Sequence, residues 1–195
     1  MRPRQRLWGS GDPADHVLIL CGGMAALSTY SAAGQQQIVG IASRGTVLGT
    51  TEGLVPARRD YDAEVMLGGT AMAVRLDAVR DVVEGGGRGA VAFAGLALRC
   101  TISLARRVRE VGYGTVEQRL ARLMLHFVDT EGLADARGVL IPMPISRTRL
   151  AALLGCRLET LVRVLRREDV NEMIAVVKEG ILILDVARLT DLADL

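Results

Sequence analysis

The sequence predicts an α+β fold in which a domain of short antiparallel strands precedes a long helix and a small helical domain. Two observations carry this prediction. Glycine and turn residues cut the first half into pieces of strand length, and apolar residues recur at helical intervals from Ala90 onward. Half of the 195 residues are hydrophobic, which excludes intrinsic disorder, and only 3% are aromatic. The core is therefore expected to be aliphatic.

The first half is expected to form a small sandwich or barrel of antiparallel strands. Turn signals such as Gly22-Gly23, Arg44-Gly45 and Gly68-Gly69 separate its apolar runs. The runs of strand length are residues 17–20, 37–41, 64–67 and 71–76.

A long helix is expected beyond the three glycines at 85–87. Apolar side chains at intervals of 3, 4, 4, 3 and 3 residues form a stripe close to a heptad seam, consisting of Val91, Ala94, Leu98, Ile102, Ala105 and Val108. So narrow a stripe can pack on its own domain or on a second copy of the helix, as in a coiled coil. We favour a homodimer whose interface contains Leu98, Ile102 and Ala105.

A second helix is expected after the break at Gly112 and Gly114. Thr115 followed by Gln118 fits the capping-box pattern, in which each residue satisfies a free backbone N–H of the other. The expected buried face consists of Val116, Leu120, Leu123, Met124 and Phe127. Residues 132–144, with two prolines, are interpreted as a connector.

The next segment has the pattern of a helix-turn-helix. Ser146 is placed to cap a two-turn helix, Gly155 marks a tight turn, and a second helix follows to Leu165. The small core between the helices would consist of Leu150, Leu153, Leu154, Leu161, Val164 and Leu165. Residues 173–177 and 180–184 are then expected to form a β-hairpin wing.

Charge is distributed unevenly, although the whole chain has a net charge of only +2. Residues 146–167 carry six arginines against Glu159 alone, net +5, whereas residues 168–195 carry seven acidic residues against two basic ones, net −5. A solvated helix face is one explanation for the arginines. Their place in a helix-turn-helix favours binding to an anionic partner instead.

The order of these elements resembles the CRP/FNR family of bacterial transcription factors along essentially the whole chain. The strongest match is the run Val116 to Leu125 together with Leu150-Ala-x-Leu-Leu-Gly-x-x-x-Glu159-Thr-x-x-Arg163. Weaker matches are the glycine-punctuated opening from Gly11 and the run Gly45-Thr-Val-Leu-Gly49. The resemblance implies a β-roll (jelly-roll) sensor domain at 1–87, a dimerisation helix at 88–112 and a winged helix-turn-helix at 113–195. It also implies promoter DNA and RNA polymerase as partners.

The residue types suit DNA for a reason independent of the family. A guanidinium can donate two hydrogen bonds to guanine and a carboxylate can accept one from cytosine, so Arg163 and Glu159, one helical turn apart, could recognise neighbouring base pairs. The residues expected to bind phosphates are Arg147, Arg149, Arg157, Thr160 and Arg166. The alternative is that Glu159 and Arg163, at i and i+4, form only a surface ion pair.

The effector pocket departs from the pattern of cyclic-nucleotide-binding members. Where those have Gly-Glu and then Arg-Ser-Ala, this chain has Gly49-Thr50 and Arg59-Asp60-Tyr61, and a carboxylate beside a phosphate site repels the phosphate. Leu104 stands where adenine-binding members offer a hydroxyl. We therefore expect an effector other than cyclic AMP, an FNR-like branch, and Arg59 as a surface charge. The candidate pocket residues are Gly49, Thr50, Arg59, Tyr61 and Leu104.

No cofactor or metal is predicted, and the effector is left unidentified. Three cysteines are too few for a four-thiolate cluster, and His126 on an amphipathic helix is better explained by packing or exposure than by haem ligation. For Cys156, a buried turn position is favoured over a redox switch. No nucleophile–base–acid set is present, so no enzyme is predicted.

Two functions remain at this point. The first is a homodimeric, cytoplasmic regulator that binds a palindromic promoter site. The second is a ligand-binding or protein-docking module whose winged helix has lost DNA readout. No uninterrupted apolar run approaches the roughly 20 residues of a membrane span, so no membrane partner is expected.

Overall fold

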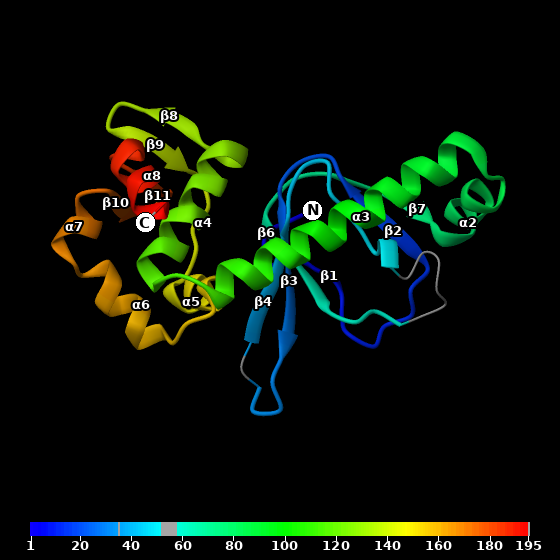
Figure 1. Cartoon of the computed structure of the whole chain (residues 1–195), viewed down its shortest axis with the longest axis horizontal. Coiled ribbons are helices and arrows are strands. Elements are labelled where there is room, and N and C mark those ends of the chain that lie inside the picture. The colour runs from blue at the N-terminus through cyan, green and yellow to red at the C-terminus, as the bar shows by residue number, and fades with distance from the viewer. Residues whose placement is uncertain (35, 52–57, 195) are drawn as a thin grey trace. The chain divides into compact units, whose positions relative to one another are not determined.

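The computed structural model describes residues 1–34, 36–51 and 58–194, and the chain divides into two compact units (Figure 1). The first unit is Met1–Arg107 and the second is Val108–Leu195. The predicted order, strands followed by a long helix and then a small helical domain, is confirmed.

The described residues of the first unit form two antiparallel sheets. The four-stranded sheet has the order β1-β6-β3-β4, and the three-stranded sheet has the order β5-β2-β7. The strands are β1 (Arg6–Trp8), β2 (His16–Leu20), β3 (Met24–Tyr30), β4 (Gln36–Ala42), β5 (Val47–Leu48), β6 (Asp62–Leu67) and β7 (Ala71–Arg75). All four predicted strand segments lie within these strands to within one residue.

Alternation along β2 and β5 gives this unit two small cores. Leu18 and Leu48 are buried with Trp8 and residues from both sheets, whereas Val17 and Val47 are buried on the other side, against the helices. This is the period-2 pattern of a strand that is covered on both faces. The expected aliphatic sandwich is therefore present, with Trp8 buried in one core and Phe93 in the other.

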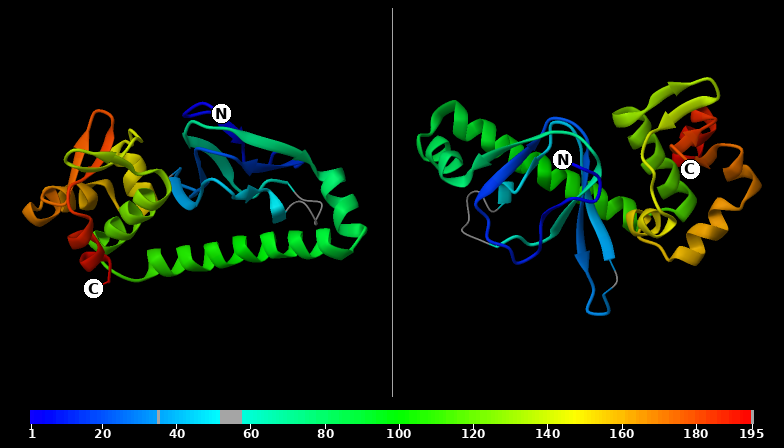
Figure 2. Two further views of the ribbon diagram at one scale, coloured as in Figure 1. Left: turned by 90° about the horizontal axis from the view of Figure 1, so that it is seen from above. Right: turned by 180° about the vertical axis from the view of Figure 1, so that it is seen from behind.

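Two helices follow these strands: α2 (Leu76–Glu84), and α3 (Gly87–Gly112), which belongs to the first unit as far as Arg107. Phe93 of α3 is buried among Val17, Val47 and Leu76, and Leu96 packs beside it. On the opposite side of α3, Val91, Leu98 and Ile102 are each more than half exposed, and Figure 2 shows from above that the sheets cover only one side of this part of the helix. The predicted long helix is confirmed, and it presents a second apolar side that its own unit does not bury.

The second unit is built around α4 (Val116–Glu131). Its capping box is formed as predicted, with the Thr115 hydroxyl accepting from the Gln118 N–H at 3.3 Å and the Gln118 side chain accepting from the Thr115 N–H at 2.8 Å. Leu120, Met124 and Phe127 are buried, and α4 packs against three of the later helices of the unit. The helices that follow α4 are α5 (Arg147–Leu154), α6 (Leu158–Leu165), α7 (Glu168–Asn171) and α8 (Val186–Asp194), and α4 packs against α5, α6 and α8.

The interpretation of residues 132–144 as a plain connector is wrong. They contain β8 (Leu133–Asp135) and β9 (Gly138–Ile141), a hairpin that joins the wing strands β10 (Ile174–Val177) and β11 (Gly180–Ile183). The resulting antiparallel sheet has the order β10-β11-β9-β8. Both prolines follow β9, so they end the strand without interrupting its ladder.

Candidate nucleic-acid interface

The turn between α5 and α6 has the local geometry that the sequence predicts. The Ser146 hydroxyl accepts from the Arg149 N–H at 3.2 Å and caps the start of α5. At the other end Gly155 adopts φ 61° and ψ 41°, a left-handed conformation in which glycine has no Cβ to clash. The N–H of Cys156 then donates to the Ala151 carbonyl at 3.1 Å. The chain is thus turned sharply into α6.

The helix α6 has a buried face and an exposed face. Leu161 and Val164 are buried on the side of α5, where Leu150, Leu153 and Leu154 are also buried. This packing confirms the predicted helix-turn-helix. The exposed residues at α6 and its ends are Arg157, Leu158, Glu159, Arg163 and Arg166, with Thr160 half-buried.

Glu159 and Arg163 are free to meet a partner. Within the described part of the chain, no side-chain hydrogen bond or ion pair joins them or engages either one. The alternative of a simple surface ion pair is therefore not what the structure adopts. Both side chains project from the same exposed face, as residues four apart on a helix do.

The two arginines of α5 differ in accessibility. Arg147 is exposed, whereas Arg149 is half-buried and its Nε and Nη2 atoms are shielded from solvent. A phosphate could approach Arg147 directly but only part of the Arg149 guanidinium. Of these two predicted contacts, Arg147 is the more accessible.

Sequence reasoning missed three residues near this surface. Leu158 is 39% exposed at the start of α6, where an apolar side chain could meet a thymine methyl group. Arg167, beyond α6, is held by Glu117 at 2.9 Å and by Asp169 at 2.8 Å. Arg119 of α4 donates to the Leu154 carbonyl. An exposed leucine on a polar helix face is a signal visible in the sequence, but the long-range pairings are not.

The wing is a regular hairpin. β10 and β11 pair from Ile174 with Ile183 to Val177 with Gly180, so Lys178 and Glu179 form its tip. At its base Glu172 accepts from Arg188 at 2.7 Å. Glu172, just before the wing, is therefore held by an arginine of α8.

The expectation that Arg59 is a surface charge is wrong. The side chain is 1% exposed, its Nη2 donates to the His16 carbonyl at 2.5 Å, and its guanidinium carbon lies 4.1 Å from the centre of the Trp8 ring. A carbonyl acceptor and an aromatic face together offset the cost of burying the charge. Gly49 lies against it with φ 81°, and a Cβ there would be 2.4 Å from Arg59 Nη1.

The other candidate pocket residues are only partly brought together. Thr50 is buried and its hydroxyl contacts the Cys100 sulfur at 3.5 Å, while the half-buried Tyr61 ring lies 6.0 Å from the Trp8 ring. Leu104 is 54% exposed on α3. Residues 52–57, within the segment compared with the nucleotide pocket, lie outside the described residues.

The uncovered side of α3 is strongly apolar. Leu98 is 63% exposed, Ile102 is 59% exposed, and Ala105 is exposed too. Among the described residues, the part Gly87–Ala105 meets the length and composition of a membrane span, with a mean hydropathy of 1.3 and 6% of the window buried. One such helix is weak evidence for a span, because a self-association interface needs the same exposed apolar surface.

The thiols and imidazoles do not form a metal site in the described residues. No group of three or more His, Cys, Asp and Glu side chains there could hold an ion, and all three cysteines are free. His126 is exposed beside the Phe127 ring. Cys156 is half-buried, and burial raises the pKa of its thiol despite the nearby Arg119 charge.

Comparisons with known proteins agree with this geometry. Residues 1–85 match the model of the cyclic nucleotide-binding domain, and residues 118–192 match that of the Crp-like helix-turn-helix domain. The chain is 27% identical over 194 residues to the transcriptional activatory protein AadR of Rhodopseudomonas palustris, covering 98% of this chain and 79% of that protein.

Two solved structures have the same fold along their length. The CRP-family regulator TTHB099 of Thermus thermophilus superimposes with a TM-score of 0.83 at 19% identity, covering 100% of this chain and 96% of that one. FixK2 of Bradyrhizobium japonicum gives 0.79 at 20% identity, covering 98% and 93%. The chain therefore belongs to the CRP/FNR family of transcription regulators, with a β domain of the cyclic-nucleotide-binding type and a helix-turn-helix DNA-binding domain.

Proposed function

We propose that this regulator acts as a homodimer that binds an imperfect palindrome in promoter DNA. The observation that carries the proposal is α6, whose buried face fixes it against α5 while Glu159 and Arg163 stand exposed and unpaired within the described part of the chain. In the major groove, Arg163 would donate to guanine O6 and N7, and Glu159 would accept from a cytosine amino group.

The surrounding cations would bind the phosphates. Arg147, Arg157 and Arg166 are exposed, and Thr160 and Arg149 are half-buried beside them. Contacts of this kind set the register and much of the affinity without recognising sequence. The net charge of +5 over residues 146–167 supports such a role.

Self-association would use the uncovered side of α3. Leu98, Ile102 and Ala105 lie on one stripe, and a second copy of the helix would remove that stripe from water. The α6 helices of the two protomers, which we call the recognition helices, would then lie in successive major grooves about 34 Å apart, which is one turn of the double helix.

The effector is proposed to be other than cyclic AMP. The Arg59 guanidinium is already engaged by the His16 carbonyl and the Trp8 ring, and Thr50 is turned toward Cys100. A cyclic phosphate would have to displace these contacts. Membership of an FNR-like branch stays a prediction, as do a cytoplasmic location and contact with RNA polymerase.

The direct test is selection of bound fragments from random duplexes, with and without cyclic AMP. The expected result is an enriched palindrome whose recovery does not depend on the nucleotide, with affinity that falls steeply as salt rises. If no duplex is retained at low ionic strength, the proposal fails, and the docking-module alternative is favoured instead.

A further inference from the structure

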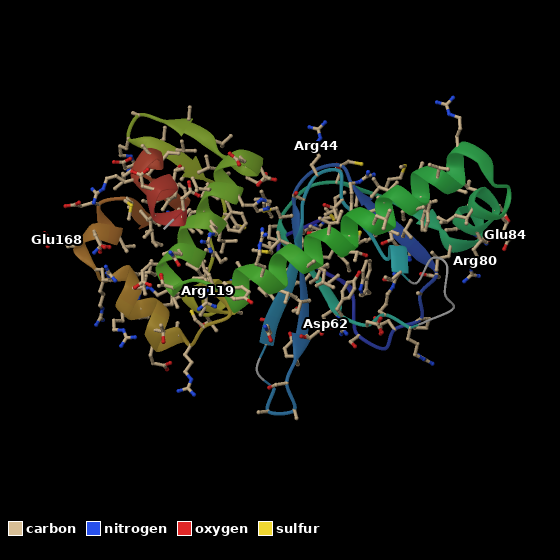
Figure 3. All side chains as sticks on the ribbon, viewed as in Figure 1. Arg44, Asp62, Arg80, Glu84, Arg119 and Glu168 are labelled. Atoms are coloured by element: carbon tan, nitrogen blue, oxygen red, sulfur yellow. The ribbon has the colours of Figure 1, made fainter. Side chains whose placement is uncertain are left out.

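The first turn of α4 contacts the chain at both ends of α6. Before α6, Arg119 Nη1 donates to the Leu154 carbonyl at 2.8 Å and to the Gly155 carbonyl at 3.5 Å. After α6, Glu117 accepts from Arg167 Nη1 at 2.9 Å. Figure 3 shows Arg119 where α4 begins, beside α5. Two side chains on one helical turn thus bracket the recognition helix.

The Arg119 contact satisfies a specific need of the turn. The last carbonyls of a helix have no partner within it and carry the negative end of the helix dipole. At the end of α5, the N–H groups of Gly155 and Cys156 satisfy the carbonyls of Ala151 and Ala152. Leu154, the last residue of α5, has its carbonyl bound by the guanidinium instead.

The second contact is electrostatic as well as geometric. Burial alone would raise the pKa of Glu117, but hydrogen bonds from its backbone and Thr115, together with the Arg167 charge, outweigh burial and hold that pKa below its ordinary value. Glu117 is therefore ionised at neutral pH. Arg167 directly follows Arg166, the C-cap of α6, so the pair links the residue just beyond α6 to the first turn of α4.

We propose that Arg119 is a positioning residue that fixes the angle at which α6 leaves the turn and thereby sets the DNA sequence selectivity of the regulator. This inference rests on the proposed function. Base readout needs side chains held within about 0.5 Å of their productive positions, whereas phosphate contacts by long, flexible arginines tolerate more movement. A less rigid turn should therefore lower the affinity for the selected site more than the affinity for random duplexes.

Arg122 provides a matched control. It lies one turn further along α4 and its Nε donates to the Ala193 carbonyl, near the end of α8, at 2.9 Å. The chemistry is the same, an α4 guanidinium on a carbonyl in the last turn of a helix, but the helix held is not α5. Arg122→Gln should thus reproduce the loss of charge and of one such bond without loosening the recognition helix.

The reactivity of a thiol tests, without DNA, whether Arg119 stabilises the turn between α5 and α6. In a Cys21→Ser, Cys100→Ser background the half-buried Cys156 is the sole thiol and lies in the turn itself. Arg119→Gln should raise its rate of reaction with a disulfide reagent roughly fivefold or more, since local opening exposes it, and Arg122→Gln should change the rate less than about twofold. Loss of the Arg119 charge alone would slow the reaction, because that charge lowers the pKa of the Cys156 thiol and so favours the reactive thiolate. If Cys156 reacts at an unchanged or slower rate in Arg119→Gln, Arg119 does not keep the turn closed and the proposal is overturned.

A binding measurement tests selectivity. The ratio of affinities for the selected palindrome and for a random duplex should fall roughly tenfold in Arg119→Gln and remain within about twofold of wild type in Arg122→Gln. Arg119→Lys, which keeps a donor and the charge, should restore part of the ratio. A wild type that binds no duplex overturns the proposed function and this role with it. A wild type that selects DNA while Arg119→Gln selects equally well overturns the positioning role alone.

Discussion

Replacing Arg163 with alanine separates base readout from phosphate binding. The side chain is exposed on α6, one turn beyond Glu159, and the structure gives it no partner among the described residues. The substitution therefore breaks no intramolecular bond, and the fold should persist. Any loss of binding then reports the contact with DNA.

The expected magnitude follows from the contact that the side chain can make. A guanidinium that forms two hydrogen bonds with guanine contributes about 1–3 kcal/mol of discrimination, which is roughly 5- to 150-fold in affinity for the selected site. Affinity for random duplexes should fall much less. Preference should relax at one base pair in each half-site.

The assay is fluorescence anisotropy with the selected palindrome and its single-base variants across a range of salt concentrations. Arg147→Ala serves as the control because Arg147 is also exposed but lies at the start of α5. It should weaken all duplexes alike and reduce the salt slope by about 0.9 per lost phosphate contact. If Arg163→Ala keeps full selectivity, the assignment of Arg163 to base readout is refuted.

Three further predictions concern the rest of the chain. Ile102→Glu should give monomers in sedimentation equilibrium, because it places a charge in the apolar stripe of α3. Ser103→Glu, about 100° around the helix, should not, and an unaltered Ile102→Glu dimer would remove α3 from the interface. Arg59→Ala should lower the free energy of unfolding of the first unit by about 2 kcal/mol in urea titrations, since it loses the contact with Trp8, and an unchanged value would contradict a structural role. For Glu117 the folded pKa lies below its ordinary value of 4.5, so its contribution to stability is present above that pH and is lost as pH falls through the folded pKa. Wild type should therefore lose stability more steeply than Glu117→Gln in acid melts, and parallel curves would contradict this ion pair.

Local signals in the sequence predicted much of the fold. The capping box at Thr115, the Ser146 cap and the tight turn at Gly155 all depend on residues within a few positions of each other, and each is present. The helix α2 was missed because Arg75 at its N-cap makes no side-chain capping bond and the helix follows β7 directly. The hairpin of β8 and β9 was missed because prolines close to a short strand resemble a connector.

The candidate site was less predictable where it depends on distant residues. Arg59 was expected at the surface because arginine is rarely buried, but the His16 carbonyl that it binds is 43 residues away in sequence. The carbonyl held by Arg119 is 35 residues away. Neither hydrogen bond corresponds to a pattern of neighbouring residues in the sequence, because the partners come together only when the chain folds. The exposed face of α6, by contrast, follows from helical periodicity alone.

The most direct measurement of the central claim is the stoichiometry of the complex with the selected duplex, obtained by analytical ultracentrifugation. Two protomers should bind one palindrome, and moving the half-sites apart by half a helical turn, about 5 base pairs, should abolish tight binding because the second recognition helix would face the wrong side of the duplex. One protomer per duplex, with affinity indifferent to that spacing, would contradict the account.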